Sequence, residues 1–200
     1  MSTTAIRPTY SPHSVLADVL PRHAVVDVAV VISGAALTGL AAQVAVHTPL
    51  SPVPFTLQTL SVLLVAAAVG PVRAVLTMAL YLGAGAAGVP WFAQHSSGWG
   101  GPTFGYLLGF LAAALLVGAL ARRGASRNAL ATALTMVVGN AVVYAVGVTW
   151  LALSLSLDLS TALELGLWPF LVGDAVKLAV AAAALPTAWA LLGRLDRRAR

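Results

Sequence analysis

The sequence has no cysteine and very little charge, and both shortages narrow the choice of protein class. Without cysteine there is neither a disulfide framework nor thiolate chemistry. Only 8% of the residues are Asp, Glu, Lys or Arg, whereas 60% are hydrophobic. Soluble domains carry roughly 25% charged and 45–50% apolar residues. Because this chain has too little polar surface to face water, we expect an integral membrane protein.

The sequence also lacks the motifs of common enzymes and nucleotide-binding proteins. It contains no G-x-x-x-x-G-K-[ST] pattern, so the chain is not expected to hydrolyse a nucleotide by itself. His95 and Ser96 are adjacent, but neighbouring side chains rarely aim at each other, and no G-x-S-x-G context surrounds them. The four His residues show no metal-ligand spacing. We therefore expect no catalysis, no metal and no cofactor.

Long apolar runs dominate the sequence and divide it into six candidate transmembrane spans. The breaks between them are rich in Pro, Gly or Arg. An apolar segment at 155–165 fits an interfacial helix between the last two spans. We expect an all-α fold, a compact bundle of six transmembrane helices over 24–193. The runs cover 24–46, 54–69, 73–89, 103–121, 129–153 and 167–193.

Basic residues mark one side of this expected topology. When alternate loops are placed on opposite sides, all but one of the 11 Lys and Arg residues fall on the same side. By the positive-inside rule that side is the cytoplasm. We expect a multi-pass protein of the cell membrane with both termini cytoplasmic, a leader at 1–23 and a basic tail at 194–200. The net charge of +5 then reflects topology, and no nucleic-acid partner is expected. The basic residues on that side are Arg7, Arg22, Arg73, Arg122, Arg123, Arg127, Arg194, Arg197, Arg198 and Arg200.

Lys177 is the exception, because it lies inside the last span with Asp174 one helical turn earlier. At the rise of an α-helix, Asp174 is about 9 Å and Lys177 about 13 Å from the outer end of this span. A charged residue at a helix centre costs about 2.5 to 3.5 kcal/mol on insertion scales, so both should face a protein interior or a polar cavity. The alternative is an i,i+3 ion pair that only softens the cost of burial. We favour a site in which a polar solute completes the pair.

Other polar and aromatic residues fall at a matching depth near the outer ends of the spans. Asn140 is the most informative, because an amide in mid-span must find a partner, although an interhelical hydrogen bond satisfies it as well as a ligand does. A Tyr near a helix end also serves as an interface anchor. The segment 91–101 is rich in Gly and aromatics, which suits a loop that covers a bound ring. The candidate solute contacts outside the last span are Gln58, Tyr81, Trp91, Phe92, Gln94, Tyr106, Asn140 and Tyr144.

Small residues recur at four-residue spacing in the first span, at Ala35 with Gly39 and at Ala41 with Ala45. Such faces let helix backbones approach each other closely in lipid, where no hydrophobic force acts between helices. They predict either packing within the protein or a docking face for another membrane subunit.

Four segments, in order along the chain, resemble the BioY family, the biotin-specific substrate-binding (S) components of energy-coupling-factor (ECF) transporters. They are S-P-V-P-F-T-L-Q-T-L at 51–60, the stretch 70–90, G-P-T-F-G-Y-L-L-G-F at 101–110, and G-D-x-x-K at 173–177. The sequence departs from the family at Phe104, where Gly is common, and in the loop around Gln94, which is usually richer in Gly.

The resemblance implies a six-helix subunit that captures biotin at the outer face and delivers it inward. It also implies partners, namely a transmembrane coupling subunit and two cytoplasmic ATPases that supply the energy. Docking on the coupling subunit would use the small-residue faces of the first span. The alternatives are an S component for another vitamin, because one architecture can carry different pockets, and a non-transporting membrane scaffold.

Biotin suits the candidate site, because its ureido group offers two N–H donors and a carbonyl on an apolar bicycle with a carboxylate tail. We expect Asp174 to accept the ureido N–H groups and Lys177 to bind the ureido oxygen or the carboxylate. Trp91, Phe92 and Tyr106 are expected to flank the apolar parts.

Overall fold

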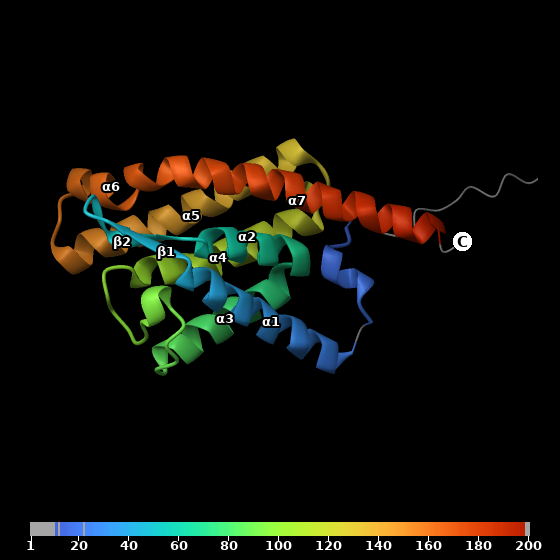
Figure 1. Cartoon of the computed structure of the whole chain (residues 1–200), viewed down its shortest axis with the longest axis horizontal. Coiled ribbons are helices and arrows are strands. Elements are labelled where there is room, and N and C mark those ends of the chain that lie inside the picture. The colour runs from blue at the N-terminus through green and yellow to red at the C-terminus, as the bar shows by residue number, and fades with distance from the viewer. Residues whose placement is uncertain (1–10, 12, 22, 199–200) are drawn as a thin grey trace, which may run out of the picture.

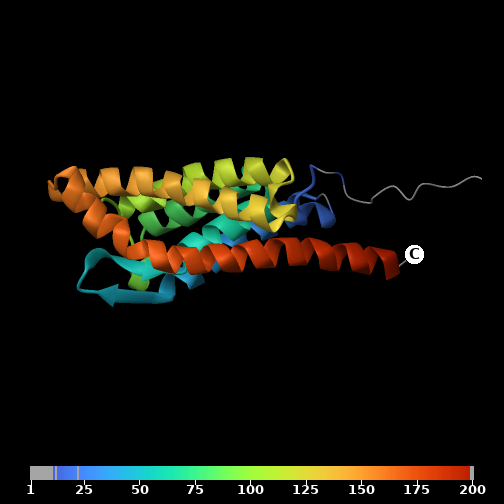
Figure 2. The same cartoon turned by 90° about the horizontal axis from the view of Figure 1, so that it is seen from above.

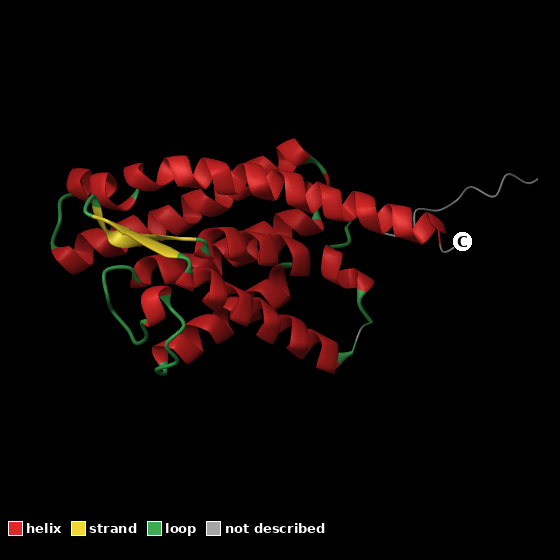
Figure 3. Ribbon diagram, in the orientation of Figure 1, coloured by secondary structure: helices red, strands yellow, loops and turns green. Residues whose placement is uncertain are grey.

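The computed structural model describes residues 11, 13–21 and 23–198, which form an elongated helical bundle with one small hairpin (Figures 1 and 3). Seen from above, most helices run along the long axis (Figure 2). Part of the predicted leader and tail, including Arg7, Arg22 and Arg200, lies outside the described residues, as do the side chains of 196–198.

Seven α-helices and two strands make up the described structure. The helices are α1 (Ala24–Gln43), α2 (Gln58–Val69), α3 (Pro71–Ala86), α4 (Phe104–Arg122), α5 (Ala129–Leu155), α6 (Leu159–Gly166) and α7 (Leu171–Arg198). Short 3-10 turns are η1 (Leu16–Val19), η2 (Ala93–His95), η3 (Ala125–Arg127) and η4 (Trp168–Phe170). Strands β1 (Ala45–Thr48) and β2 (Ser51–Thr56) pair antiparallel.

The helices follow the predicted spans except at the hairpin, which replaces the end of the first run and the start of the second. The cause is proline: Pro49, Pro52 and Pro54 cannot sit in a helix interior, and each biases the residue before it toward extended backbone. Helix α2 therefore begins only at Gln58. The expected connecting helix between the last two spans is present as α6, capped by the Asp158 carboxylate.

Four helical stretches in the described chain are long and apolar enough to cross a membrane: α1, α4, α5 and the run from Leu159 to Leu195. Helices α2 and α3 are apolar but have only 12 and 16 residues. At about 1.5 Å per residue they measure about 18 and 24 Å, against a hydrocarbon core of about 30 Å. The structure thus shows a mostly helical chain of membrane type.

Helix α4 lies at the centre of the bundle, and 61% of its apolar stretch is buried inside the protein. Two of its glycines allow neighbouring backbones to come close. A Cβ added at Gly109 would lie 2.9 Å from the Val143 Cα, and one at Gly118 would lie 2.6 Å from the Pro71 nitrogen. These close approaches fix α4 against α5 and against the α2–α3 turn, and so position the residues at its start.

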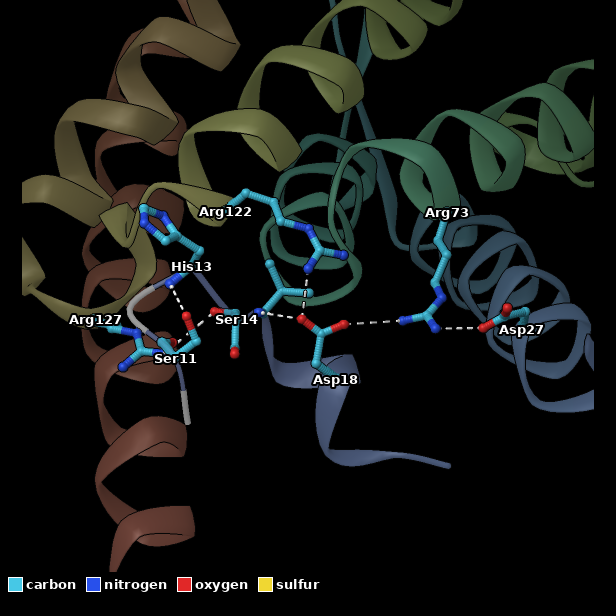
Figure 4. Close-up of polar contacts among 9 residues, drawn as sticks. Ser11, His13, Ser14, Asp18, Asp27, Arg73, Arg122 and Arg127 are labelled. Atoms are coloured by element: carbon cyan, nitrogen blue, oxygen red, sulfur yellow. Dashed lines mark hydrogen bonds and ion pairs between the residues drawn. The ribbon is translucent and has the colours of Figure 1, made fainter. Parts of the chain in front are cut away.

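The described part of the leader folds back onto one end of the bundle (Figure 4). Asp18 accepts a hydrogen bond from Arg122 at 2.7 Å and lies 3.8 Å from Arg73, which also pairs with Asp27 at 2.5 Å. Val15 beside them is fully buried. The leader therefore joins α1, α3 and α4 through a charge network at the Arg-rich end.

Candidate solute-binding site

A cavity of about 400 Å³ lies at the end of the bundle opposite the Arg-rich network. Its walls come from β2, the starts of α2 and α4, the loop 92–103, the middle of α5 and the segment 170–177. Small-molecule sites in proteins have volumes of about 300–1,000 Å³. The cavity is therefore large enough for a vitamin-sized solute.

Asp174 and Lys177 both line this cavity. The Lys177 ammonium donates to Asp174 Oδ1 and to the Thr59 hydroxyl, each at 2.9 Å. The other carboxylate oxygen, Oδ2, accepts from the Tyr144 hydroxyl and, at 3.3 Å, from the Asn140 amide. The side chains of Asp174 and Lys177 are only 8% and 17% exposed. The two charges are therefore not paired only with each other, because α2 and α5 supply further partners.

The pair keeps some hydrogen-bonding capacity for a ligand. A carboxylate has about four lone-pair positions, and an ammonium has three N–H donors. Three of those positions on Asp174 and two donors of Lys177 are used within the described structure. One acceptor position of Asp174 and one donor of Lys177 have no partner among the described residues. Buried polar groups normally have partners, so this unused capacity favours a polar solute.

Aromatic side chains form the apolar part of the cavity. Tyr106 lies on the wall and donates its hydroxyl to the Gly166 carbonyl at 2.8 Å, which fixes its ring. Phe170 is held by stacking on Phe55, with ring centroids 4.4 Å apart. Phe92 and Phe104 are buried on the same wall. Fixed flat faces of this kind suit an apolar ring system.

Gln58 reaches the cavity, but two of the predicted contacts, Tyr81 and Trp91, lie behind its wall. The Gln58 amide donates to the Tyr81 hydroxyl at 2.6 Å. That hydroxyl donates to the Trp91 carbonyl at 3.2 Å, and the Trp91 indole donates back to the Tyr81 carbonyl at 2.9 Å. Trp91, which was expected to flank the solute, is not among the residues that line the cavity, and its ring packs on Tyr81 and toward Gly39 of α1. Both residues support Gln58 instead.

The remaining predicted contacts divide in the same way. Phe92, Gln94, Tyr106 and Tyr144 line the cavity. Asn140 does not, and it contacts Asp174 from the side away from the cavity. Its amide oxygen is buried without a hydrogen-bond partner among the described residues.

Several cavity residues are absent from the contacts predicted from sequence. Thr59 follows Gln58 directly at the start of α2, so the sequence places it near the same end of the span. Its contact with Lys177 depends on the tertiary structure. Phe170 and Phe110 each stand four residues from a predicted contact, Asp174 and Tyr106. Helical residues at i and i+4 share a face, and this spacing could have identified both.

Ala35 and Gly39 take the first of the two roles predicted for the small-residue faces, packing within the protein. Ala35 is fully buried, and a Cβ added at Gly39 would lie 3.3 Å from the Trp91 Cβ. Both residues therefore pack inside the protein. Ala41 is half-buried and Ala45 lies on strand β1, so this second pair does not form a helical face.

Comparison with known proteins agrees with the resemblance stated from motifs. Residues 13–194 match the BioY family. The biotin transporter BioY of Thermotoga maritima is 40% identical over 138 residues, which cover 67% of this chain and 79% of that protein. The probable biotin transporter BioY of Pyrococcus horikoshii is 37% identical over 158 residues, covering 78% and 91%.

A solved structure shares the fold. The S-component for biotin from an ECF-type ABC transporter, determined by crystallography, superposes with a TM-score of 0.73 over 86% of this chain and 92% of that chain, at 20% identity. The relatives are named as transporters, in agreement with the expectation that this chain is not an enzyme. The chain belongs to the BioY family.

Proposed function

We propose that the chain is the biotin-binding membrane subunit of an ECF-type uptake transporter. Family membership and the fold of a biotin S-component support this assignment. The observation that carries it is the pair Asp174 and Lys177, buried on the wall of an aromatic-lined cavity with one acceptor position and one donor unused.

The unused positions suggest how biotin binds. Lys177 donates its third N–H to the ureido oxygen, and Asp174 accepts one neighbouring ureido N–H. The sequence hypothesis gave Asp174 both ureido N–H groups, but Tyr144, Asn140 and Lys177 already occupy most of its lone pairs. The bicycle lies among the aromatic rings, and the carboxylate tail points to the mouth beside Gln94.

A ligand-dependent melting screen on the purified protein tests this function. A ligand that binds only the folded state stabilises it by about 2.7 kcal/mol at a concentration 100 times its Kd. Biotin should raise the Tm, whereas thiamine and riboflavin should not. Stabilisation by another vitamin would point to a different substrate, and no stabilisation by biotin would contradict the proposed function.

We further propose six membrane passes by α1, α2, α3, α4, α5 and α7, with both termini in the cytoplasm of a cell-membrane protein. Gathering of Arg73, Arg122 and Arg127 at one end of the bundle supports this orientation. The short helix α2 gains length from β2, which continues toward the cavity end. Because the chain has no cysteine, single cysteines can be introduced at Ser97 and Arg194 and tested with an impermeant thiol reagent added on each side of the membrane in turn. A thiol at position 97 should react only from outside and one at position 194 only from inside.

A transmembrane coupling subunit and two cytoplasmic ATPases are the proposed partners, as implied by the ECF-type context of the structural neighbour. We place the contact with the coupling subunit on the exposed apolar face of α1. On this face Val28, Ile32 and Leu40 are 57%, 53% and 68% exposed. This face replaces the buried Ala35 and Gly39. Co-purification with the coupling subunit should be lost in Ile32→Asp, whereas biotin binding persists.

A further inference from the structure

Gln43, the last residue of α1, bonds to four backbone groups with one amide side chain. Its nitrogen lies 2.9 Å from the Gly39 carbonyl oxygen and 3.1 Å from each of the Trp91 and Phe92 carbonyl oxygens, so its two N–H groups are shared among three acceptors. Its oxygen accepts the backbone N–H of His95 at 3.0 Å. Three of these four groups belong to the loop that follows α3. Gln43 therefore holds this loop against the end of α1.

The loop needs such an external partner because its own conformation is unfavourable. Gln94 and His95 have φ values of 59° and 57°, in the left-handed region that L-residues adopt only when their surroundings hold them there. Within the loop, Phe92 donates its N–H to the Ser96 carbonyl at 3.0 Å. The His95 N–H, between these two residues, is accepted by Gln43.

The same loop forms one side of the cavity mouth. Phe92, Gln94 and Ser97 line the cavity. Across the mouth, the Gln94 side chain contacts His47 on strand β1. If the loop moved away from α1, the mouth would widen and Phe92 would leave the apolar wall. Gln43 does not line the cavity and makes no direct contact with its contents.

We propose that Gln43 is a positioning residue that latches the 91–97 loop over the cavity and so sets how long the solute stays bound. The inference rests on the proposed function. Loss of the amide would raise the population of the open loop, and dissociation through that open form would accelerate in proportion. The Asp174 and Lys177 side chains lie outside this loop and stay in place when it opens, so the effect falls mainly on the dissociation rate.

The experiment compares biotin dissociation from wild type and Gln43→Ala by chase of labelled biotin in detergent. Several hydrogen bonds are lost, so we expect dissociation to accelerate at least about tenfold. Gln43→Glu keeps the acceptor for His95 but loses both donors to the loop, and should show a smaller acceleration. Ser33→Ala, an exposed change on the same helix, should behave like wild type.

Ala93→Cys gives a second measurement, the rate of thiol labelling, which can be made without biotin as well as with it. Ala93 is half-buried on the cavity wall, and the natural chain has no other thiol. Maleimide should label the introduced thiol faster in the Gln43→Ala background, and biotin should protect it less. If Gln43→Ala is too unstable to purify, Gln43→Glu carries the same comparison.

The outcomes separate the latch from the proposed function. Dissociation within twofold of wild type, with unchanged labelling at Ala93→Cys, would overturn the latch while leaving biotin binding intact. Absence of biotin binding to wild type would overturn the proposed function, and the labelling rates without ligand would still test the latch.

Discussion

The carboxylate of Asp174 offers the sharpest test of the binding site, through the substitution Asp174→Asn. The change keeps the shape of the side chain but removes its charge, its ion pair with Lys177 at 2.9 Å and one of its two acceptor oxygens. Hydrogen bonds to charged groups contribute about 1.5–3 kcal/mol. We therefore expect biotin affinity to fall by about 10- to 150-fold.

Calorimetric titration of the purified variant with biotin measures this loss. Glu164→Gln is the matched control, because it makes the same carboxylate-to-amide change on an exposed position of α6. Melting without ligand shows whether each variant is folded. An Asp174→Asn protein that melts cooperatively and binds biotin within twofold of wild type would refute the role given to this carboxylate.

Three further predictions concern the pair, the central packing and the leader. Lys177→Met leaves Asp174 buried without its cation, which should cost about 3–5 kcal/mol of stability and abolish measurable biotin binding in the same titration. Gly118→Val places side-chain carbon against Pro71 and should lower the free energy of unfolding by about 1–3 kcal/mol, measured by chemical denaturation. Asp18→Asn removes the negative charge that faces Arg122 and Arg73, and it should lower the Tm of the ligand-free protein while biotin affinity stays within twofold. A variant with the Tm of wild type would contradict the bracing role of the leader.

The sequence alone predicted most of the helices and singled out the charged pair. Both predictions rest on the energetic cost of placing a polar backbone or a charged side chain in lipid. Apolar runs of membrane length exclude most other structures in lipid. A buried carboxylate and ammonium are expensive wherever the helix points them, so Asp174 and Lys177 stood out without any knowledge of neighbours. Their actual partners, Thr59 on α2 and Tyr144 on α5, depend on tertiary packing and were not paired with them from sequence.

The direction of individual side chains was harder to predict. Helix α1 is apolar all round, so hydropathy did not say which face turns inward. The small-residue motif therefore left packing and docking open, and the structure buries Ala35 inside the protein. Tyr81 and Trp91 were expected to contact the solute, but they bond to Gln58 and to each other and do not line the cavity. The hairpin before Gln58 was overlooked, although the prolines at 49, 52 and 54 mark it.

The measurement that tests the central claim most directly is equilibrium dialysis of the purified wild-type protein against labelled biotin, with unlabelled thiamine as competitor. If biotin fills the unused hydrogen-bonding positions of Asp174 and Lys177, one biotin should bind saturably per chain, and excess thiamine should not displace it. A folded protein that shows no saturable uptake of biotin, or that releases it to thiamine, would contradict the account.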